Sequence, residues 1–435
     1  MRKLANRILR LLLMGLTLYL VFSLGVFLGP YRPLPSVFRL ALQGLNELSI
    51  KLGVRQPWYF RQMTRPYAPP IRNTPRAYNG LNLITRVGKG RKLSVDIMTM
   101  SGQKIHEWKT DWFKIWPNAT HLPEDVVPQS RPGTHVHGVI MMKNGDIVFN
   151  FETLGLVRLD LNGDVVWRLP YRTHHSVHRH DDGNLWVCGL KERTNRDPYF
   201  PNHIPPFAES TLLEVSPGGK ILHEWSVAEL LRKNNLGGLL SLARAELRDE
   251  VRSDRLHLND VEPFSAALGE SFFVEGDVLV SLRNINTVFV FNGQTAKIKF
   301  ICVGWFNGQH DPDFIDGNSF SVFDNNAITR PAEGPHSRIV IVSARTNTYR
   351  VFFEGTPKTP FHTDILGKHQ WLPNGNLLIS ESVWGRAFEI TPRGEVVWEY
   401  TNYVGPGIVG LVEEVQRLPL QYTALFRHEA ARKEH

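Results

Sequence analysis

Cysteine is scarce in this sequence, which holds only two among 435 residues, Cys188 and Cys302. Both stand in apolar, strand-like runs, NLWVCGL and KFICVGW, so the pattern favours two buried thiols, although an exported protein could join them as a disulfide. A GxxxxGK(S/T) motif is also missing from the sequence. This absence excludes a nucleotide site of the usual phosphate-loop kind.

Acidic residues are nearly absent from the first 76 positions, which hold twelve lysines and arginines and a single acid, Glu47. The remaining positions hold 38 basic and 41 acidic residues, so the formal net charge of +8 comes from the N-terminal part. A basic segment of this kind suits the surface of an anionic membrane. We therefore expect no nucleic-acid partner.

Charge is missing altogether from Leu11 to Tyr31, and most of that run is apolar. Such a length can cross a membrane as a helix, and the basic residues before it keep that end inside the cell. A cleaved signal peptide is the alternative, but the run lacks an Ala-x-Ala-like site at its end. We expect a basic cytoplasmic N-terminus at 1–10, a single-pass inner-membrane anchor in contact with lipid at 11–31, and a basic stem at 32–76. The rest of the chain is then expected in the periplasm or outside the cell.

The sequence is rich in one repeat. Each copy consists of a strand, a glycine turn and a second strand, and the second strand often ends in tryptophan. Four clear copies end at Trp108, Trp167, Trp225 and Trp398, and two weaker copies lie between the last two. A glycine turn and a short apolar strand precede five of the copies, at 144–151, 182–189, 275–282, 316–323 and 374–381.

Four short strands in each unit, repeated about six times at spacings of some 40–60 residues, are typical of a propeller. The predicted fold is therefore all-β, a six-bladed β-propeller over 77–404 with an N-terminal transmembrane helix and a few helical insertions. A helical insertion is expected at 227–255. The C-terminal tail at 405–435 is expected to be helical from Ile408.

Histidines recur at one place in the repeat. His137, His175, His310 and His369 precede the turn glycine of their units by six to eight residues, and His257 opens the remaining unit. The first strand of each propeller blade lines the central axis, so these five imidazoles are expected to meet at one end of it, with Arg283 nearby. His174 crowds the same stretch as His175.

Such a histidine set has two functional interpretations. Neutral imidazoles bind Zn, Cu or Fe, and they also act as nucleophiles and as general acids or bases. Arg283 could form a surface salt bridge, but a guanidinium among imidazoles disfavours a metal cation and suits an anionic sulfuryl or phosphoryl group. Asn259 lies two residues after His257, on the same face of its strand. We therefore expect neither a metal nor another cofactor.

The motifs HLND (257–260), SLRN (281–284), GQHD (308–311), HH…DGN (174–184) and HQWLPNGN (369–376) resemble those of the bacterial aryl-sulfate sulfotransferases. The resemblance spans about residues 80–400 and implies an exported six-bladed propeller that transfers sulfuryl groups by a ping-pong route without a nucleotide donor. By this resemblance His310 is the nucleophile, His257 is an acid, base or hydrogen-bond donor, and Asn259 and Arg283 hold the sulfuryl oxygens. His175 or His174 completes the substrate site, with His137 and His369 beside it.

The expected partners are an aryl sulfate donor and a hydroxyl acceptor. Soluble members of that family lose their signal and carry a close cysteine pair, whereas this chain has neither a suitable cleavage site nor such a pair. The anchor therefore suggests a surface or lipid-linked glycan as acceptor rather than a soluble phenol. Two other functions compete: a non-catalytic propeller that binds an envelope glycan or a protein partner, and a metal- or quinone-dependent oxidoreductase.

Overall fold

The computed structural model describes residues 44–50, 52–63, 69–124, 126–197, 200, 205–242, 256–327 and 336–426, with five single residues before position 24. The predicted anchor at 11–31 falls almost entirely outside this set. Among the residues that are described, no helix has both the length and the apolar character needed to span a membrane. The anchor therefore stays a prediction.

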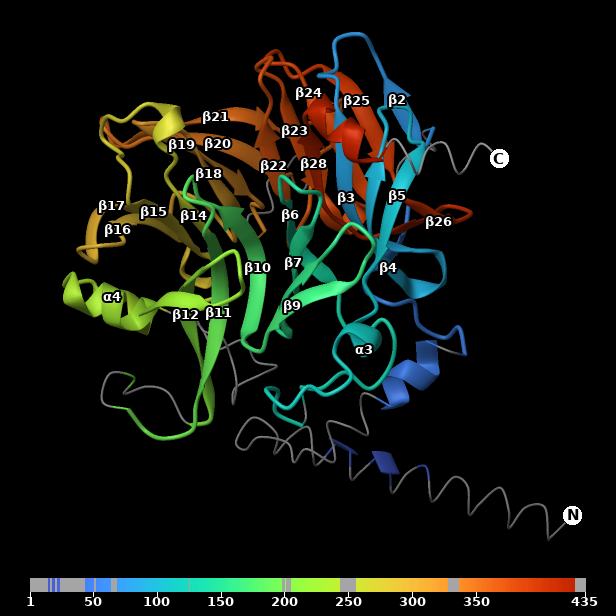
Figure 1. Ribbon diagram of the computed structural model, residues 1–435, viewed down its shortest axis with the longest axis horizontal. Coiled ribbons are helices and arrows are strands. Elements are labelled where there is room, and N and C mark those ends of the chain that lie inside the picture. Colours follow the sequence, from blue (N-terminus) through green and yellow to red (C-terminus); the bar gives the residue numbers. More distant parts are fainter. Residues whose placement is uncertain are drawn as a thin grey trace, which may run out of the picture.

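The described chain is all-β, as the sequence predicts, and its strands form antiparallel sheets (Figure 1). One sheet joins the C-terminal strand β28 (Val412–Leu418) to β3 (Leu81–Gly88), β4 (Lys92–Met98) and β5 (Lys104–Lys109). The next contains β6 (Val136–Met141), β7 (Ile147–Phe151), β8 (Gly155–Leu159) and β9 (Val165–Leu169). A third contains β10 (Arg172–Arg179), β11 (Leu185–Arg193), β12 (Phe207–Val215) and β13 (Ile221–Ser226).

Three further sheets follow in chain order. The fourth contains β14 (Leu258–Pro263), β15 (Asp277–Leu282), β16 (Thr287–Asn292) and β17 (Lys297–Val303). The fifth contains β18 (His310–Asp316), β19 (Ser319–Asp324), β20 (Arg338–Ser343) and β21 (Thr348–Glu354). The sixth contains β22 (Lys368–Trp371), β23 (Leu377–Glu381), β24 (Arg386–Ile390), β25 (Val396–Thr401) and, at its outer edge, β2 (Ile71–Asn73). A small separate sheet is formed by β1 (Phe60–Gln62), β26 (Tyr403–Gly405) and β27 (Ile408–Gly410).

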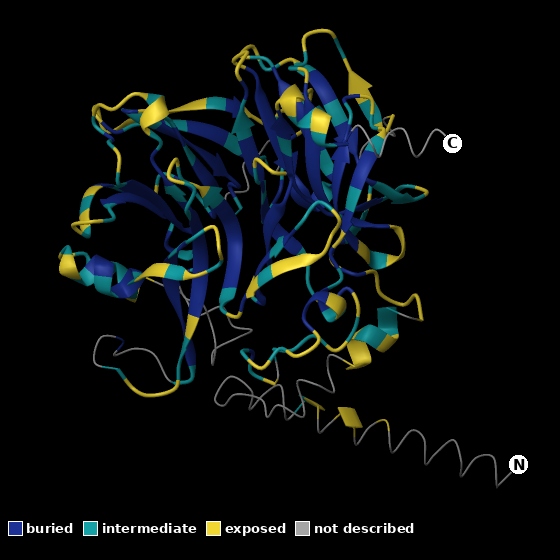
Figure 2. Cartoon of the chain, viewed as in Figure 1, coloured by how far each residue is buried: buried dark blue, intermediate teal, exposed yellow. Residues whose placement is uncertain are grey.

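The innermost strands of the six large sheets lie next to one another at the centre of the molecule. In the order β28, β6, β10, β14, β18 and β22, each contacts the next, and β22 contacts β28. Each of these strands stands at one end of its sheet, so the other strands follow outward. Figure 2 agrees, because the central strands are buried and the exposed residues gather at turns and outer edges. This arrangement brings the starts of six strands to one place.

The repeat seen in the sequence corresponds to the second, third and fourth strands of the sheets. The short strands after glycine turns are β7, β11, β15, β19 and β23, and turn residues such as Gly145 adopt a positive φ (92°) that suits glycine. The tryptophans bind the neighbouring sheet. Trp108 Nε1 donates to Asp160 O at 2.8 Å, and Trp167 Nε1 donates to Pro217 O at 3.0 Å, each in a turn of the next sheet. These hydrogen bonds help to fix each sheet against the next.

The helical tail predicted from Ile408 is wrong. Residues 408–410 and 412–418 form β27 and β28, and β28 pairs with β3 so that Leu418 faces Leu81 and Val415 faces Ile84. The charged sequence VEEVQRL reads as helical alone, but pairing with a distant strand decides its conformation. The insertion predicted at 227–255 is helical where described, in α4 (Val227–Lys233) and a 3₁₀ turn at Gly237–Ser241. The two cysteines are buried and are not joined in a disulfide, as the sequence favours.

Candidate functional site

The starts of the innermost strands share a local irregularity. Over the described chain, the pairing register shifts in β6, β10, β14, β18 and β28, in each case within the first residues of the strand. A β-bulge of this kind bends a strand and re-aims its side chains, often next to an active site. His175, His257 and Asp311 take positive φ values of 57°, 52° and 49° at these places. The repeated bulges therefore present polar side chains toward the centre.

Four of the predicted histidines come together there. The His175 ring centroid lies 4.1 Å from that of His137, 5.1 Å from that of His257 and 6.2 Å from that of His310. These rings are contributed by, or directly precede, the four strands β6, β10, β14 and β18. Each of the four residues is buried or nearly so. His175 is thus the ring that connects the others.

His174 and His369 take different places. His174 Nδ1 lies 2.6 Å from His175 Nδ1, a hydrogen bond that holds the His175 ring in place. His175, and not His174, contacts the other imidazoles. His369 is fully buried, and its Nδ1 lies 3.1 Å from Asp311 Oδ2. None of the ring contacts found among the described residues joins His369 to the other four. The structure therefore places His369 beside Asp311 and not, as the sequence predicts, in contact with the other four rings.

His310 has a well-defined hydrogen-bonding environment. Its Nδ1 lies 2.7 Å from Asn325 Oδ1 and 3.1 Å from Gly308 O, and both of these atoms are acceptors. Nδ1 must therefore carry the proton, and Nε2 must carry the lone pair. Burial, followed by the charge of Arg283, lowers the pKa of His310 to about 3. At neutral pH His310 is a neutral imidazole with a nucleophilic Nε2.

Arg283 and Asn259 both act on the region around His257 and His310. Burial and then Arg283 hold the pKa of His257 well below its usual value, so this guanidinium acts on both His257 and His310. Asn259 Nδ2 donates to Gln309 O at 2.7 Å and thereby holds the backbone just before His310. Asn259 Oδ1 is buried and has no hydrogen-bond partner among the residues described. Asn259 therefore positions His310 through the backbone of Gln309.

A layer of buried charged groups lies next to the histidines. Lys368 Nζ lies 2.6 Å from Asp311 Oδ1, and Asp311 Oδ2 accepts from His369 N at 2.6 Å. Burial alone would raise the pKa of Asp311, but Lys368 and His369 outweigh it and lower that pKa. His178 Nε2 lies 3.0 Å from Asp260 Oδ1, a contact that raises the pKa of His178 despite its burial. Two ion pairs thus balance part of the charge at the centre.

Carboxyl groups gather on the side formed by β6 and β28. His137 Nδ1 lies 2.6 Å from Glu152 Oε2, and His137 Nε2 lies 3.2 Å from Glu413 Oε1. His135 Nε2 lies 3.6 Å from Glu413 Oε2. Burial, then Glu152 and Glu414, raises the pKa of Glu413 well above its usual value. The centre therefore gathers carboxyl groups on one side and carries Arg283 near His257 and His310.

Sequence reasoning missed several of these residues. Lys368 directly precedes a predicted histidine, so adjacency within the motif was the available signal. His135 stands two residues before His137, a spacing that places both on one face of a strand. Glu413 had no such signal, because its segment was expected to be helical.

Fold and site together define an all-β protein whose buried centre combines neutral imidazoles, a guanidinium and fixed amides, a set suited to transferring an anionic group. The chain belongs to the arylsulfotransferase (ASST) family, because the sequence model of that family matches residues 138–403. The match confirms the family resemblance seen in the sequence motifs. Membership suggests aryl sulfotransferase activity and supports, at the level of the family, transfer without a nucleotide sulfate donor.

No curated protein matches the sequence. Among solved structures, a protein of unknown function from Bacteroides caccae is 15% identical over 77% of this chain and 98% of its own, with a TM-score of 0.47. A virginiamycin B lyase from Staphylococcus aureus is 10% identical over 78% and 88%, with a TM-score of 0.38. A streptogramin B lyase is 11% identical over 81% and 91%, with a TM-score of 0.39. These likenesses are too weak to support any inference about function.

Proposed function

We propose that this protein transfers a sulfuryl group from an aryl sulfate to a hydroxyl acceptor through a sulfohistidine formed on His310. Family membership supports the transferred group. The observation that supports His310 is its fixed tautomer: Asn325 Oδ1 accepts from Nδ1, which leaves the lone pair on Nε2. No other residue is needed to remove a proton from this nucleophile.

The transfer takes place in two steps. In the first, His310 Nε2 attacks sulfur, an N–S bond forms, and the S–O bond to the aryl oxygen breaks as the phenolate leaves. In the second, the acceptor hydroxyl attacks sulfur, the N–S bond breaks, and the hydroxyl proton passes to a base. His257 is a neutral imidazole in the same cluster and serves as that base.

Arg283 stabilises the charge that develops on the sulfuryl oxygens in both steps. Its electrostatic influence on His257 and His310 supports this role. Asn259 acts through Gln309, whose own amide is anchored to Ser281 Oγ at 3.1 Å. This chain of contacts supports a positioning role for Asn259 in addition to the direct contact implied by the family resemblance.

The overall architecture belongs to the same proposal. Six large sheets whose first strands contact one another in a ring support a six-bladed propeller, in which β28 completes the blade of β3, β4 and β5. The sequence supports a single-pass anchor and an exported propeller. An enzyme held at a membrane surface would meet a surface or lipid-linked glycan as acceptor.

The experiment is incubation of the detergent-solubilised protein with 4-nitrophenyl sulfate, without an acceptor. We expect release of one equivalent of nitrophenol per chain and a sulfurylated peptide that contains His310, located by mass spectrometry. A label on another histidine would sink the assignment of His310 but keep the chemistry. Neither nitrophenol nor a label with any aryl sulfate would favour a propeller that only binds a glycan.

A further inference from the structure

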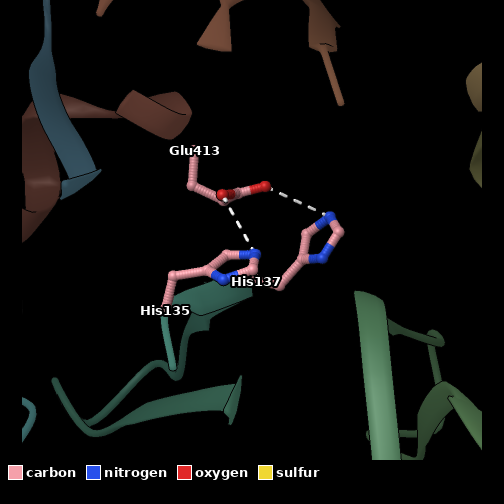
Figure 3. Close-up of side chains that lie close together, drawn as sticks. All are labelled: His135, His137 and Glu413. Carbon is pink, nitrogen blue, oxygen red and sulfur yellow. Dashed lines mark ion pairs between the residues drawn. The ribbon is translucent and has the colours of Figure 1, made fainter. Parts of the chain in front are cut away.

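His135, His137 and Glu413 form a three-sided set of donor atoms at the junction of two sheets (Figure 3). His135 directly precedes β6 and His137 lies in it, whereas Glu413 comes from β28. Figure 3 shows both carboxylate oxygens of Glu413 directed at ring nitrogens, one at each histidine. One donor atom from each residue lies within 4.8 Å of the other two.

We propose that His135, His137 and Glu413 bind a divalent transition-metal ion of the zinc class. Two imidazoles and one carboxylate are donors that zinc accepts in sites that keep a fourth position open. Ligands about 2.0–2.1 Å from a tetrahedral zinc are separated by about 3.4 Å. The His137 Nε2–Glu413 Oε1 distance is 3.2 Å and the His135 Nε2–Glu413 Oε2 distance is 3.6 Å, so each ring nitrogen lies near this separation from one oxygen of Glu413.

The hydrogen bond on the far side of His137 supports this role. His137 Nδ1 lies 2.6 Å from Glu152 Oε2, so the Nδ1–H group donates a hydrogen bond to the carboxylate and Nε2 keeps a lone pair toward Glu413. A carboxylate behind a ligating histidine is the usual outer partner in metal sites, where it orients the ring. The chain thus provides both the ligand and the group that fixes its tautomer.

Unsatisfied atoms provide a second, independent observation. Glu413 is 2% exposed, and its Oε2 has no hydrogen-bond partner within the described part of the chain. His135 Nε2 is also buried without such a partner. Buried polar atoms of this kind normally bind something, because leaving them unpaired costs free energy. Both atoms belong to the set shown in Figure 3, and a cation between them would satisfy both.

Two other groups of possible ligands are less suitable. In the group of His137, Glu152 and His175, the short contacts of His137 Nδ1 with Glu152 and of His175 Nδ1 with His174 already use these ring nitrogens. In the group of Asp311, Asp313 and His369, the ammonium of Lys368 lies 2.6 Å from Asp311 and would repel a cation.

The sequence-based argument against a metal rested on Arg283. In the structure, Arg283 acts on His257 and His310. The charge of Glu152 acts on His135, and the charges of Glu152, Glu414 and Lys368 act on Glu413. Glu152, Glu413 and Glu414 lie close together on the β6–β28 side, where a cation would offset the mutual repulsion of their carboxylates. The arginine and the proposed metal therefore occupy different sides of the same centre, and both can be present.

The test measures bound zinc and thermal stability in full-length protein that is first stripped with EDTA and then dialysed against Zn²⁺. We expect one equivalent of zinc per chain and a Tm that rises with zinc concentration, because the ion binds only the folded state. His135→Ala and Glu413→Gln should lose both effects. Glu152→Gln should keep the stoichiometry but weaken the affinity by about 10–100-fold, the usual effect of removing an outer partner.

His223→Ala is the matched control, because His223 is an exposed histidine whose Nδ1 lies 2.7 Å from Glu214 Oε2 far from the site in sequence. It should bind zinc like the wild type. Equal zinc binding by wild type, His135→Ala and Glu413→Gln would overturn the proposal, as would the absence of a stoichiometric equivalent in the wild type.

A measurement on the wild type alone keeps the proposal testable if a variant does not fold. Cobalt(II) should bind with the intense visible absorption of a four- or five-coordinate ion, and zinc should displace it. A weak spectrum like that of the hydrated ion would overturn the site. Zinc and cobalt binding are measured without an aryl sulfate, so their failure leaves the proposed sulfuryl transfer untouched.

Discussion

Asn325 holds His310 in one tautomer. Its Oδ1 lies 2.7 Å from His310 Nδ1, while its Nδ2 donates to Thr363 O at 3.0 Å and to Leu366 O at 2.6 Å. Because both amide hydrogens face carbonyl oxygens, the amide cannot turn its nitrogen toward His310 without losing these bonds. The orientation of one buried asparagine thus decides which nitrogen of the proposed nucleophile carries the lone pair.

Asn325→Ala should slow formation of the sulfohistidine without changing the affinity for the aryl sulfate. A lost buried hydrogen bond costs about 1–3 kcal/mol, which corresponds to roughly 5–150-fold in rate. Single-turnover labelling with 4-nitrophenyl sulfate measures this rate. Asn376→Ala removes another buried asparagine, whose Nδ2 lies 2.6 Å from Glu389 Oε1, and should leave the labelling rate unchanged. Equal rates in wild type and Asn325→Ala would show that the tautomer is not fixed by this contact.

Arg283→Ala should still bind the aryl sulfate but transfer the sulfuryl group about 10²–10³ times more slowly, the usual effect of removing one preorganised charge stabiliser. Arg283→Lys should recover only part of the loss, because a point charge does not reproduce the planar fork of donors. Asn259→Ala should fall between wild type and Arg283→Ala. The rate of nitrophenol release at saturating substrate gives the comparison. Full activity in Arg283→Lys would mean that only the charge is required.

Glu262→Gln should become more stable than the wild type as pH rises. Burial raises the pKa of Glu262 to about 8, while an unfolded glutamate titrates near 4.3. Below the pKa of the unfolded state, the Glu262 carboxyl is protonated in both the folded and the unfolded protein, so its contribution to stability is fully present. Between the two pKa values only the unfolded protein loses this proton, and the free energy of unfolding of the wild type falls by about 1.4 kcal/mol per pH unit.

Urea unfolding between pH 4 and 9 checks this expectation. The difference between Glu262→Gln and wild type should widen from about pH 4.3 to about pH 8 and then level off. Glu275→Gln, at an exposed acid, is the control and should follow the wild type throughout. Parallel stability curves for Glu262→Gln and wild type would contradict the raised pKa.

A reporter fused after residue 60 should be active only outside the cytoplasm. The prediction rests on the four basic residues at 1–10 and on the uncharged run at 11–31. An alkaline phosphatase fusion, which requires an oxidising compartment, measures it, and a fluorescent protein that needs the cytoplasm gives the reciprocal signal. Cytoplasmic activity at this position would overturn the expected localisation and the proposed glycan acceptor.

The sequence predicted the parts of the fold that depend on local pattern. Glycine turns and alternating strands identified the second to fourth strands of the sheets. Position in the repeat was enough to gather His137, His175, His257 and His310, because equivalent residues of equivalent units meet at one centre.

Contacts between distant segments could not be predicted from the sequence. Glu413 contacts His137, from which it is separated by more than half of the chain, and β28, the strand of Glu413, forms by pairing with β3. The bulges that turn His175 and Asp311 inward have no strong sequence signal either, since both residues take a positive φ that is unusual outside glycine. His369 lies on β22, which lacks the register shift seen in the innermost strands of the other sheets.

The pairing of β28 with β3 also determines when the protein can finish folding. Leu81 and Leu418 are partners in that sheet, so the first sheet lacks its innermost strand until almost the whole chain has been made. Until then β3 presents an open edge of unpaired backbone groups, which invites pairing with other chains. Closure over so long a separation is intrinsically slow. The junction that holds Glu413 beside His137 is therefore completed only after β28, the last strand of the described chain, has been made.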